Sequence, residues 1–342
     1  MALRIAVMGA SGNAGRELLQ VLSERGVRGD AVIPLATGRA VGGQVSFGED
    51  DVLDLGDLDR FDFAGVDLAY CVLPERDAKA ACTRAAAAGA AVVDLSGAFR
   101  HDPAVPMVAA DVNPQALDKL AGRIVATPQV TTLMLSQALA PIHDAFSVLR
   151  CVATVVLPVS TYGRGAMDEL FNQTRGIFVN EPITSNQSEF AKQIAFNVIP
   201  AVGGFEKGGA TGEEQATAQE IFKMFGADLA CTVNAAMVPV FVGQGAFVNI
   251  ECEDGFNEDQ LRAVWRKDEG ISVVDHRQEQ GVVTPAETHG EDNLYISRVR
   301  ADTSADNAAS FWLCGDNLRR QAINAARVGE LLAARFSQPG TA

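Results

Sequence analysis

The chain has 342 residues, of which 48% are hydrophobic and 6% are aromatic, enough for two globular domains with mainly aliphatic cores. Its formal net charge of −15 argues against nucleic acids and anionic membranes as partners, because both require clustered Lys and Arg side chains. No run reaches the roughly eighteen apolar residues of a membrane span, so a cytoplasmic protein is expected.

Cysteine and histidine usage indicates neither disulfides nor a metal centre. The six cysteines contain no Cys-x-x-Cys pair and mostly lie in apolar runs, which favours buried free thiols in a reducing compartment. The four histidines, at positions 101, 143, 276 and 289, have no spacing typical of zinc ligands. No metal is therefore expected.

The first third of the chain alternates short apolar strands with helices. Strands are predicted over residues 3–8, 31–36, 68–73, 91–95 and 123–126, and helices over 16–24 and 76–88. Such alternation predicts a parallel sheet with right-handed crossovers. The expected fold class is α/β, with a Rossmann-like doubly wound domain over residues 1–129.

From residue 149 onward the predicted strands become longer and less regularly interrupted. They cover residues 149–159, 230–242, 246–253 and 294–300, with helices over 165–174, 212–225, 258–267 and 316–335. A further helix is expected to begin near Thr131. The pattern predicts a mostly antiparallel sheet with helices, that is, an α+β domain over residues 130–315.

A glycine-rich loop between the first predicted strand and helix indicates a dinucleotide site. Its residues are Gly9, Ala10, Ser11, Gly12, Asn13, Ala14 and Gly15. Glycines at this spacing allow a tight turn and the close approach of a pyrophosphate. Thr37 and Arg39 follow the second strand and suit a 2′-phosphate, so NADP is favoured over NAD. The alternatives are a turn that needs glycine only for packing and a solvated loop charge at Arg39.

Six motifs in order resemble the aspartate-semialdehyde dehydrogenase family nearly end to end. They lie at residues 9–15, 94–100, 111–114, 195–200, 238–241 and 315–320. The resemblance implies an NADP-binding domain over residues 1–129, completed by a C-terminal helix over 316–336. It also implies a catalytic and dimerisation domain over 130–315, and hence a homodimer, although pairing with an active relative stays open.

The resemblance also shows where this chain departs from the family chemistry, in which a Cys thiolate exchanges an acyl group with phosphate while hydride moves to or from NADP. The family's nucleophile falls on Val130, which has no lone pair. The acid–base His falls on Gln244, whose amide does not titrate near neutral pH. The substrate-binding Arg falls on Met237, the strand glutamine on Leu157, and a phosphate-binding Lys on Ala216. The chain therefore looks like a paralogue that lacks the catalytic cysteine.

Two polar positions of the family are retained. Arg100 matches a phosphate-contacting Arg, and Glu213 matches a substrate-contacting carboxylate; the alternative is that both form ordinary ion pairs. The favoured hypothesis is a pseudoenzyme that binds a nucleotide, a small anion or a protein partner. A second is an NADP-dependent oxidoreductase that acts without a thioester through Glu213, Arg100 or Tyr162. A third is an ordinary family enzyme whose nucleophile lies elsewhere than Val130.

Overall fold

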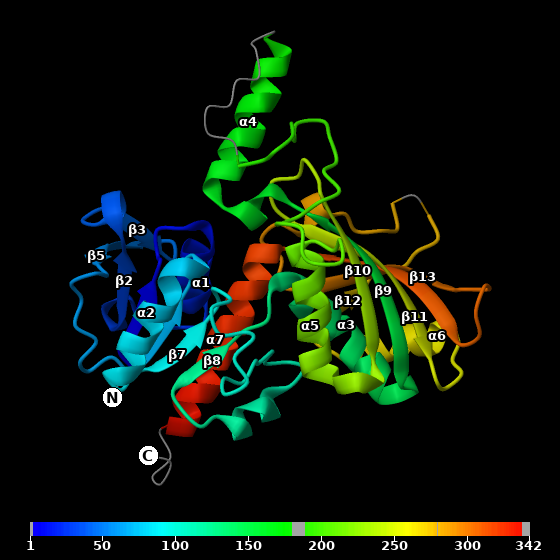
Figure 1. Cartoon of the computed structure of the whole chain (residues 1–342), viewed down its shortest axis with the longest axis horizontal. Helices are drawn as coiled ribbons and strands as arrows, with labels where there is room; N and C mark the ends of the chain where they lie inside the picture. The colour runs from blue at the N-terminus through cyan, green and yellow to red at the C-terminus, as the bar shows by residue number, and fades with distance from the viewer. Residues whose placement is uncertain (1–2, 180–188, 279, 337–342) are drawn as a thin grey trace. The chain divides into compact units, whose positions relative to one another are not determined.

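The computed structural model describes residues 3–179, 189–278 and 280–336. The chain divides into two compact units, which we call unit 1 (Met1–Gln129 with Gln321–Ala342) and unit 2 (Val130–Arg320) (Figure 1). Within the described part, no helix combines the length and the apolar character needed to cross a membrane.

Unit 1 contains a six-stranded sheet in the order β5-β2-β1-β6-β7-β8, in which every pairing is parallel. Its strands are β1 (Ile5–Met8), β2 (Val32–Ala36), β5 (Gly56–Asp57), β6 (Leu68–Cys71), β7 (Ala91–Asp94) and β8 (Ile124–Ala126). Because β1 is central and the chain winds outward from it in both directions, the predicted Rossmann-like doubly wound sheet is confirmed. The antiparallel hairpin of β3 (Gln44–Phe47) and β4 (Asp51–Asp54) was not predicted.

The sheet of unit 1 has a separate core on each face. Alternate residues of β1 point in opposite directions. Ile5 and Val7 join a cluster that includes Leu18 of α1 (Asn13–Glu24) and Ala325 of α7 (Asn317–Phe336). Their neighbours Ala6 and Met8 join a second cluster with alanines of α2 (Glu75–Ala87). Apolar runs without polar alternation therefore mark strands buried on both sides.

Unit 2 contains a second six-stranded sheet in the order β10-β9-β11-β14-β13-β12. Its strands are β9 (Val148–Leu157), β10 (Ala230–Met237), β11 (Gln244–Cys252), β12 (Ile271–Val273), β13 (Leu294–Ala301) and β14 (Ala308–Gly315). The three central pairings are antiparallel, whereas β10 pairs with β9 and β12 with β13 in parallel. The sheet is therefore mixed. The strand predicted over 230–242 ends at Met237 because Pro239 cannot donate a ladder hydrogen bond.

The helices of unit 2 are α3 (Val130–Phe146), α4 (Arg164–Phe178), α5 (Gly212–Phe225) and α6 (Glu258–Trp265). Helices α3, α5 and α6 pack on strands of the sheet. Between them lies one large core, which takes alternate residues of β9 such as Ala153 and Val155, together with Trp265 of α6. The indole of Trp265 donates to the carbonyl oxygen of Ala138 at 2.9 Å, so its polar group is satisfied inside the core.

Candidate functional site

The position matched to the family's nucleophile lies at the first residue of a helix. Val130 opens α3 and is half-buried against the core of unit 2. A helix N-terminus would stabilise a thiolate, but the isopropyl group of Val130 can neither ionise nor attack a carbonyl. The local geometry therefore suits the family's nucleophile while the side chain does not.

Two other matched positions form an apolar pair at the ends of neighbouring strands. Leu157 ends β9 and Met237 ends β10, and the two are direct partners in the parallel register. Each is only 1% exposed. Met237 also exchanges two backbone hydrogen bonds with Ile199, of 2.9 and 3.0 Å. An Arg in place of Met237 would bury a charge beside aliphatic groups, at a cost of several kcal/mol unless it found a partner.

The position that the sequence resemblance matches to the acid–base His belongs to a chain of polar side chains. Gln244 opens β11, is buried, and donates from Nε2 to Oγ1 of Thr131 at 2.8 Å. Thr131 in turn donates from Oγ1 to a carboxylate oxygen of Glu213. A glutamine amide neither takes nor gives a proton near neutral pH. The structure thus brings Gln244 together with the retained Glu213, through the residue next to Val130.

The first turn of α5 presents Glu213, with Ala216 one turn further along the same helix. The helix begins with a capping box in which the carboxylate of Glu214 accepts from the backbone N–H of Thr211. Burial acts to raise the pKa of the Glu214 carboxyl, but hydrogen bonds from the N–H groups of Thr211 and Ala235 outweigh it and hold the pKa below its usual value. Glu214 therefore anchors α5 and is no proton acceptor.

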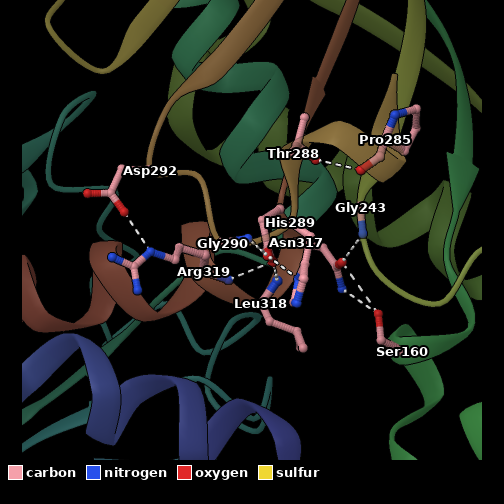
Figure 2. Close-up of polar contacts among 11 residues, drawn as sticks. Ser160, Gly243, Pro285, Thr288, His289, Gly290, Asp292, Asn317, Leu318 and Arg319 are labelled. Carbon is pink, nitrogen blue, oxygen red and sulfur yellow. Dashed lines mark hydrogen bonds and ion pairs between the residues drawn. The ribbon is translucent and has the colours of Figure 1, made fainter. Parts of the chain in front are cut away.

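A second polar network, which the sequence analysis did not single out, surrounds the start of α7 (Figure 2). Asp316 is only 2% exposed, and its carboxylate lies 3.2 Å from Nδ1 of His289, whose side chain is 71% exposed. Asp316 also accepts from backbone N–H groups at the start of α7. The signal in the sequence is an Asp placed as the N-cap of the last helix, but its pairing with His289 depends on the tertiary structure.

In the same region the side-chain amide of Asn317, at the start of α7, bonds to two other segments of the chain. Asn317 donates from Nδ2 to Oγ of Ser160 at 3.0 Å and accepts at Oδ1 from the N–H of Gly243 at 3.0 Å. Gly243 immediately precedes Gln244, and Gln244 pairs with Gly315 in the β11–β14 register. The His289–Asp316 pair and the Gln244 network therefore begin at the same end of the unit 2 sheet.

Tyr162 has a structural role in unit 2. Its hydroxyl accepts a hydrogen bond from the N–H of Gly203 at 2.6 Å, and its ring lies edge-to-face with Phe190 at 5.8 Å. Burial raises the pKa of the Tyr162 phenol, against the effect of the Gly203 hydrogen bond. These contacts favour a Tyr162 that holds the loop at Gly203 over one that transfers protons.

The glycine loop of unit 1 is shaped as a dinucleotide-binding turn. Gly9 has a φ of +94° and follows β1, and Gly12 is the N-cap of α1. A Cβ on Gly15 would lie 2.3 Å from the carbonyl oxygen of Gly9, so only glycine permits this approach of helix to strand. The backbone at Gly12 has space, because the nearest atom to a Cβ there is 3.6 Å away. The residues present therefore fit a bound pyrophosphate.

The residues that the sequence predicts to meet a 2′-phosphate lie at the carboxyl end of the neighbouring strand. Thr37 and Arg39 directly follow β2, which pairs with β1 in parallel, and both are exposed. Within the loop after β1, Ala10 is buried, whereas Ser11, Asn13 and Ala14 are half-buried. Ligands of doubly wound sheets bind at this edge, and the loop and Arg39 both lie there.

Arg100 stabilises a loop of unit 1. Its guanidinium donates from Nε to the carbonyl oxygen of Thr127 at 2.9 Å and from Nη2 to that of Leu95 at 2.8 Å. The loop begins with Asp94, whose carboxylate accepts from the backbone and hydroxyl of Ser96. These contacts give Arg100 a structural role in joining the ends of β7 and β8.

The six cysteines are free, and the predicted burial is confirmed for five of them; Cys231 is half-buried. Burial raises the pKa of Cys252 and of Cys314 to about 12. A hydrogen bond with Cys231 raises the pKa of Cys151 and lowers that of Cys231. Cys231 lies six residues before the end of β10, about 20 Å from Met237 along the strand. Cys231 is therefore remote from the end of the sheet where Gln244 is bonded to Thr131.

One group of described residues has the side-chain types of a metal site. Cys71, Cys82 and Asp94 are buried in unit 1, with ligand atoms within 4.8 Å of one another. Asp94 already accepts three hydrogen bonds from its own loop. A hydrogen bond with Cys71, together with burial, raises the pKa of Cys82, and a neutral thiol is a poor ligand. This group is best described as core packing.

Comparisons with known proteins agree over both units. Residues 4–120 match a model of the semialdehyde dehydrogenase NAD binding domain, and residues 139–320 match one of the semialdehyde dehydrogenase dimerisation domain. The aspartate-semialdehyde dehydrogenase of Rickettsia conorii is 34% identical over 333 residues, 96% of this chain and 97% of that protein. The crystal structure of aspartate semialdehyde dehydrogenase II from Vibrio cholerae gives a TM-score of 0.93 at 30% identity, covering 98% of this chain and 100% of that one. A structure of that enzyme complexed with ASA gives 0.92 at 31% identity, covering 98% and 99%.

Proposed function

The chain belongs to the aspartate-semialdehyde dehydrogenase family, and we propose that it is a pseudoenzyme for the family's phosphorylating reaction. It keeps the nucleotide-binding fold and the dimerisation domain but forms no thioester. The observation that carries the proposal is the network of Gln244, Thr131 and Glu213 beside Val130. An isopropyl group stands at the position matched to the nucleophile, and a glutamine amide bonded to Thr131 stands at the position matched to the proton shuttle.

An assay with aspartate semialdehyde, phosphate and NADP tests this proposal. We expect no phosphate-dependent formation of NADPH, while a family member that carries the cysteine reduces NADP under the same conditions. Activity that is lost on thiol alkylation would instead support an ordinary family enzyme with its nucleophile elsewhere. The burial of five cysteines and the position of Cys231 argue against that reading.

Unit 1 is proposed to bind NADP in preference to NAD, through the loop at Gly9–Gly15 with Thr37 and Arg39. Arg39→Ala is expected to weaken NADPH binding about tenfold while leaving NADH binding unchanged, because one exposed charge-assisted contact to the 2′-phosphate is lost. Isothermal titration calorimetry with both dinucleotides measures this. Arg28→Ala is the control, since Arg28 precedes the first residue of β2 whereas Arg39 follows its last residue. Equal weakening of both dinucleotides by Arg39→Ala would contradict the assigned preference.

Unit 2 is proposed to form a homodimer through the sheet face opposite its core. On this face Phe247 is 45% exposed and lies 4.7 Å from the ring of Trp312. Arg298 covers the ring of Phe247 at 5.5 Å. The match of residues 139–320 to a dimerisation domain supports a second copy as the occupant. Aromatic and Arg side chains at the centre of a patch are typical of interface hot spots.

Phe247→Asp is expected to raise the dimer dissociation constant at least about thirtyfold, the equivalent of about 2 kcal/mol. The physical reason is a carboxylate placed in the middle of an apolar contact. Sedimentation velocity over a concentration series measures the effect. Phe222→Asp is the matched control, because Phe222 is 59% exposed on α5, away from this face. A dimer unchanged by Phe247→Asp would place the interface elsewhere.

A second candidate function is an oxidoreductase that transfers hydride directly, without a covalent intermediate. Of the groups first considered for it, Glu213 is engaged with Thr131, Tyr162 with Gly203 and Arg100 with two carbonyl oxygens. The observation that favours this function is the exposed imidazole of His289 beside a buried carboxylate. The probe is NADPH consumption with aspartate semialdehyde in the absence of phosphate.

A further inference from the structure

We propose that His289, oriented by Asp316, is the proton-transferring group of unit 2, acting on the oxygen of a small carbonyl or alcohol substrate. The inference rests on the second candidate function and assigns its acid–base residue. In this proposal His289 supplies the proton transfer that the amide of Gln244 cannot.

The carboxylate of Asp316 is held by four hydrogen-bonding groups. Oδ1 accepts from the N–H groups of Leu318 and Arg319 at 2.9 and 3.0 Å. Oδ2 accepts from the N–H of Gly290 at 2.9 Å and faces Nδ1 of His289 at 3.2 Å. Since Asp316 caps α7 and is almost fully buried, its carboxylate cannot rotate away from His289 without losing these bonds.

This contact decides which ring nitrogen of His289 carries the proton. A carboxylate only accepts hydrogen bonds, so Nδ1 of His289 must be the donor. In the neutral ring Nε2 then keeps its lone pair, and in the charged ring Nε2–H is the proton to give. The side chain of His289 is 71% exposed, so substrate can reach Nε2. A buried carboxylate that orients an exposed imidazole is an arrangement suited to general acid–base catalysis.

The backbone around His289 is held firmly. The residue follows a 3₁₀ helix over Pro285–Thr288, in which Oγ1 of Thr288 donates to the carbonyl oxygen of Pro285 at 2.8 Å. A Cβ on Gly243 would lie 2.1 Å from that same oxygen, which shows how closely this turn packs against the start of β11. Gly290, with a φ of +80°, then turns the chain so that its N–H meets Asp316.

The charged side chains near His289 and Asp316 have partners of their own. Arg319 and Asp292 form an ion pair at 2.6 Å (Figure 2). Glu287 hydrogen bonds to Thr284, and Glu291 accepts from the hydroxyl of Tyr295 at 3.1 Å. The carboxylate in contact with His289 is that of Asp316. The position of the pair next to Gly315, the strand partner of Gln244, brings it to the sheet end where Gln244 lies.

In the proposed step a proton passes from His289 to the oxygen of the substrate. The Nε2–H bond of the imidazolium breaks, its electron pair stays on nitrogen, and an O–H bond forms on the carbonyl oxygen of the substrate. The carbonyl carbon gains a hydride, whose source is a reduced nicotinamide dinucleotide, the class implied by the domain matched in unit 1. The products are an alcohol and the oxidised dinucleotide, and His289 regains its proton from water.

Nitrogen NMR of histidine-labelled full-length protein tests the geometry without any substrate. We expect the neutral ring of His289 to carry its proton on Nδ1, whereas free imidazoles favour Nε2. Asp316→Asn keeps a good N-cap but removes the carboxylate acceptor, and is expected to remove this tautomer preference. A wild-type His289 that is protonated on Nε2 in its neutral form would overturn the inference.

Kinetics with NADPH and aspartate semialdehyde, without phosphate, test the role. His289→Gln is expected to lower kcat about a hundredfold, within the range for a general acid, with thermal unfolding unchanged. The control His276→Gln removes another exposed histidine of unit 2 and is expected to leave kcat unchanged. Asp316 is a positioning residue, so Asp316→Asn should lower kcat with KM unchanged, and should have no further effect in a His289→Gln background.

The outcomes separate the inference from the function on which it rests. Wild-type turnover with an unaffected His289→Gln variant overturns the inference alone. Additive losses in the double variant overturn the positioning role of Asp316, because a purely structural effect would persist without His289. A wild-type protein that consumes no NADPH overturns the second candidate function and the proton-transfer step with it.

Discussion

Val130→Cys alone is expected to leave phosphate-dependent NADP reduction undetectable. A new thiol at the start of α3 would have a favourable helix terminus, but its neighbour Thr131 is bonded to Gln244 and Glu213. The amide of Gln244, which stands at the position matched to the acid–base His, cannot move a proton during formation or breakdown of the hemithioacetal. Removing the nucleophile of a catalytic set costs about six powers of ten, and further losses then add little because the set acts as a unit. For the same reason, restoring one member of the set restores little activity while the others are missing.

The measurement is NADPH formation with aspartate semialdehyde and phosphate for the wild type, Val130→Cys, and Val130→Cys with Gln244→His. We expect the double variant to gain more than the sum of the single changes, yet to stay well below a family enzyme. Substrate binding is still missing, because Met237 is buried against Leu157 and an Arg there would need its own partner. Strong activity from Val130→Cys alone would contradict the roles given to Gln244 and Met237.

Gly15→Ala is expected to destabilise unit 1 by at least about 3 kcal/mol, at the upper end of overpacking effects. The added methyl would lie 2.3 Å from the carbonyl oxygen of Gly9 and 2.8 Å from Cα of Ala10. Both are backbone atoms and cannot rotate away, so β1 and α1 must separate. Urea denaturation followed by circular dichroism measures the loss of stability.

Gly12→Ala is the matched control within the same loop. Its φ is −76°, and its added methyl has ordinary contact distances, so a cost within about 1 kcal/mol is expected, as for a change of N-cap residue. NADPH affinity should nevertheless fall, because the methyl occupies the space through which a pyrophosphate approaches the backbone. Normal NADPH binding by Gly12→Ala would remove the support for a dinucleotide at this loop, and a stable Gly15→Ala would contradict the close packing.

The strands and helices of both units were largely predictable because they depend on local periodicity. The five strands predicted in unit 1 lie within two residues of their expected positions, and α5 has its expected bounds. The short edge strand β5 was not predicted. Elements with weak local signals were missed. The β3–β4 hairpin contains Asp and Gly among few apolar residues. The apolar run of β14 directly follows a polar turn and was not recognised as a strand. The parallel edges of the unit 2 sheet were also missed, since pairing direction is set by distant segments.

The sequence by itself determined the parallel class of the unit 1 sheet, the glycine turn and the absence of a sulfur atom at Val130, because each depends on residues close together along the chain. Only the tertiary structure decided that Gln244 meets Thr131 and Glu213, that Leu157 faces Met237, and that Asp316 holds His289. These partners come from separate elements, and hydrogen bonding acts over about 3 Å. Spacing along a chain does not specify which distant side chains reach that distance, so the polar groups of the site became visible only once the strands were paired.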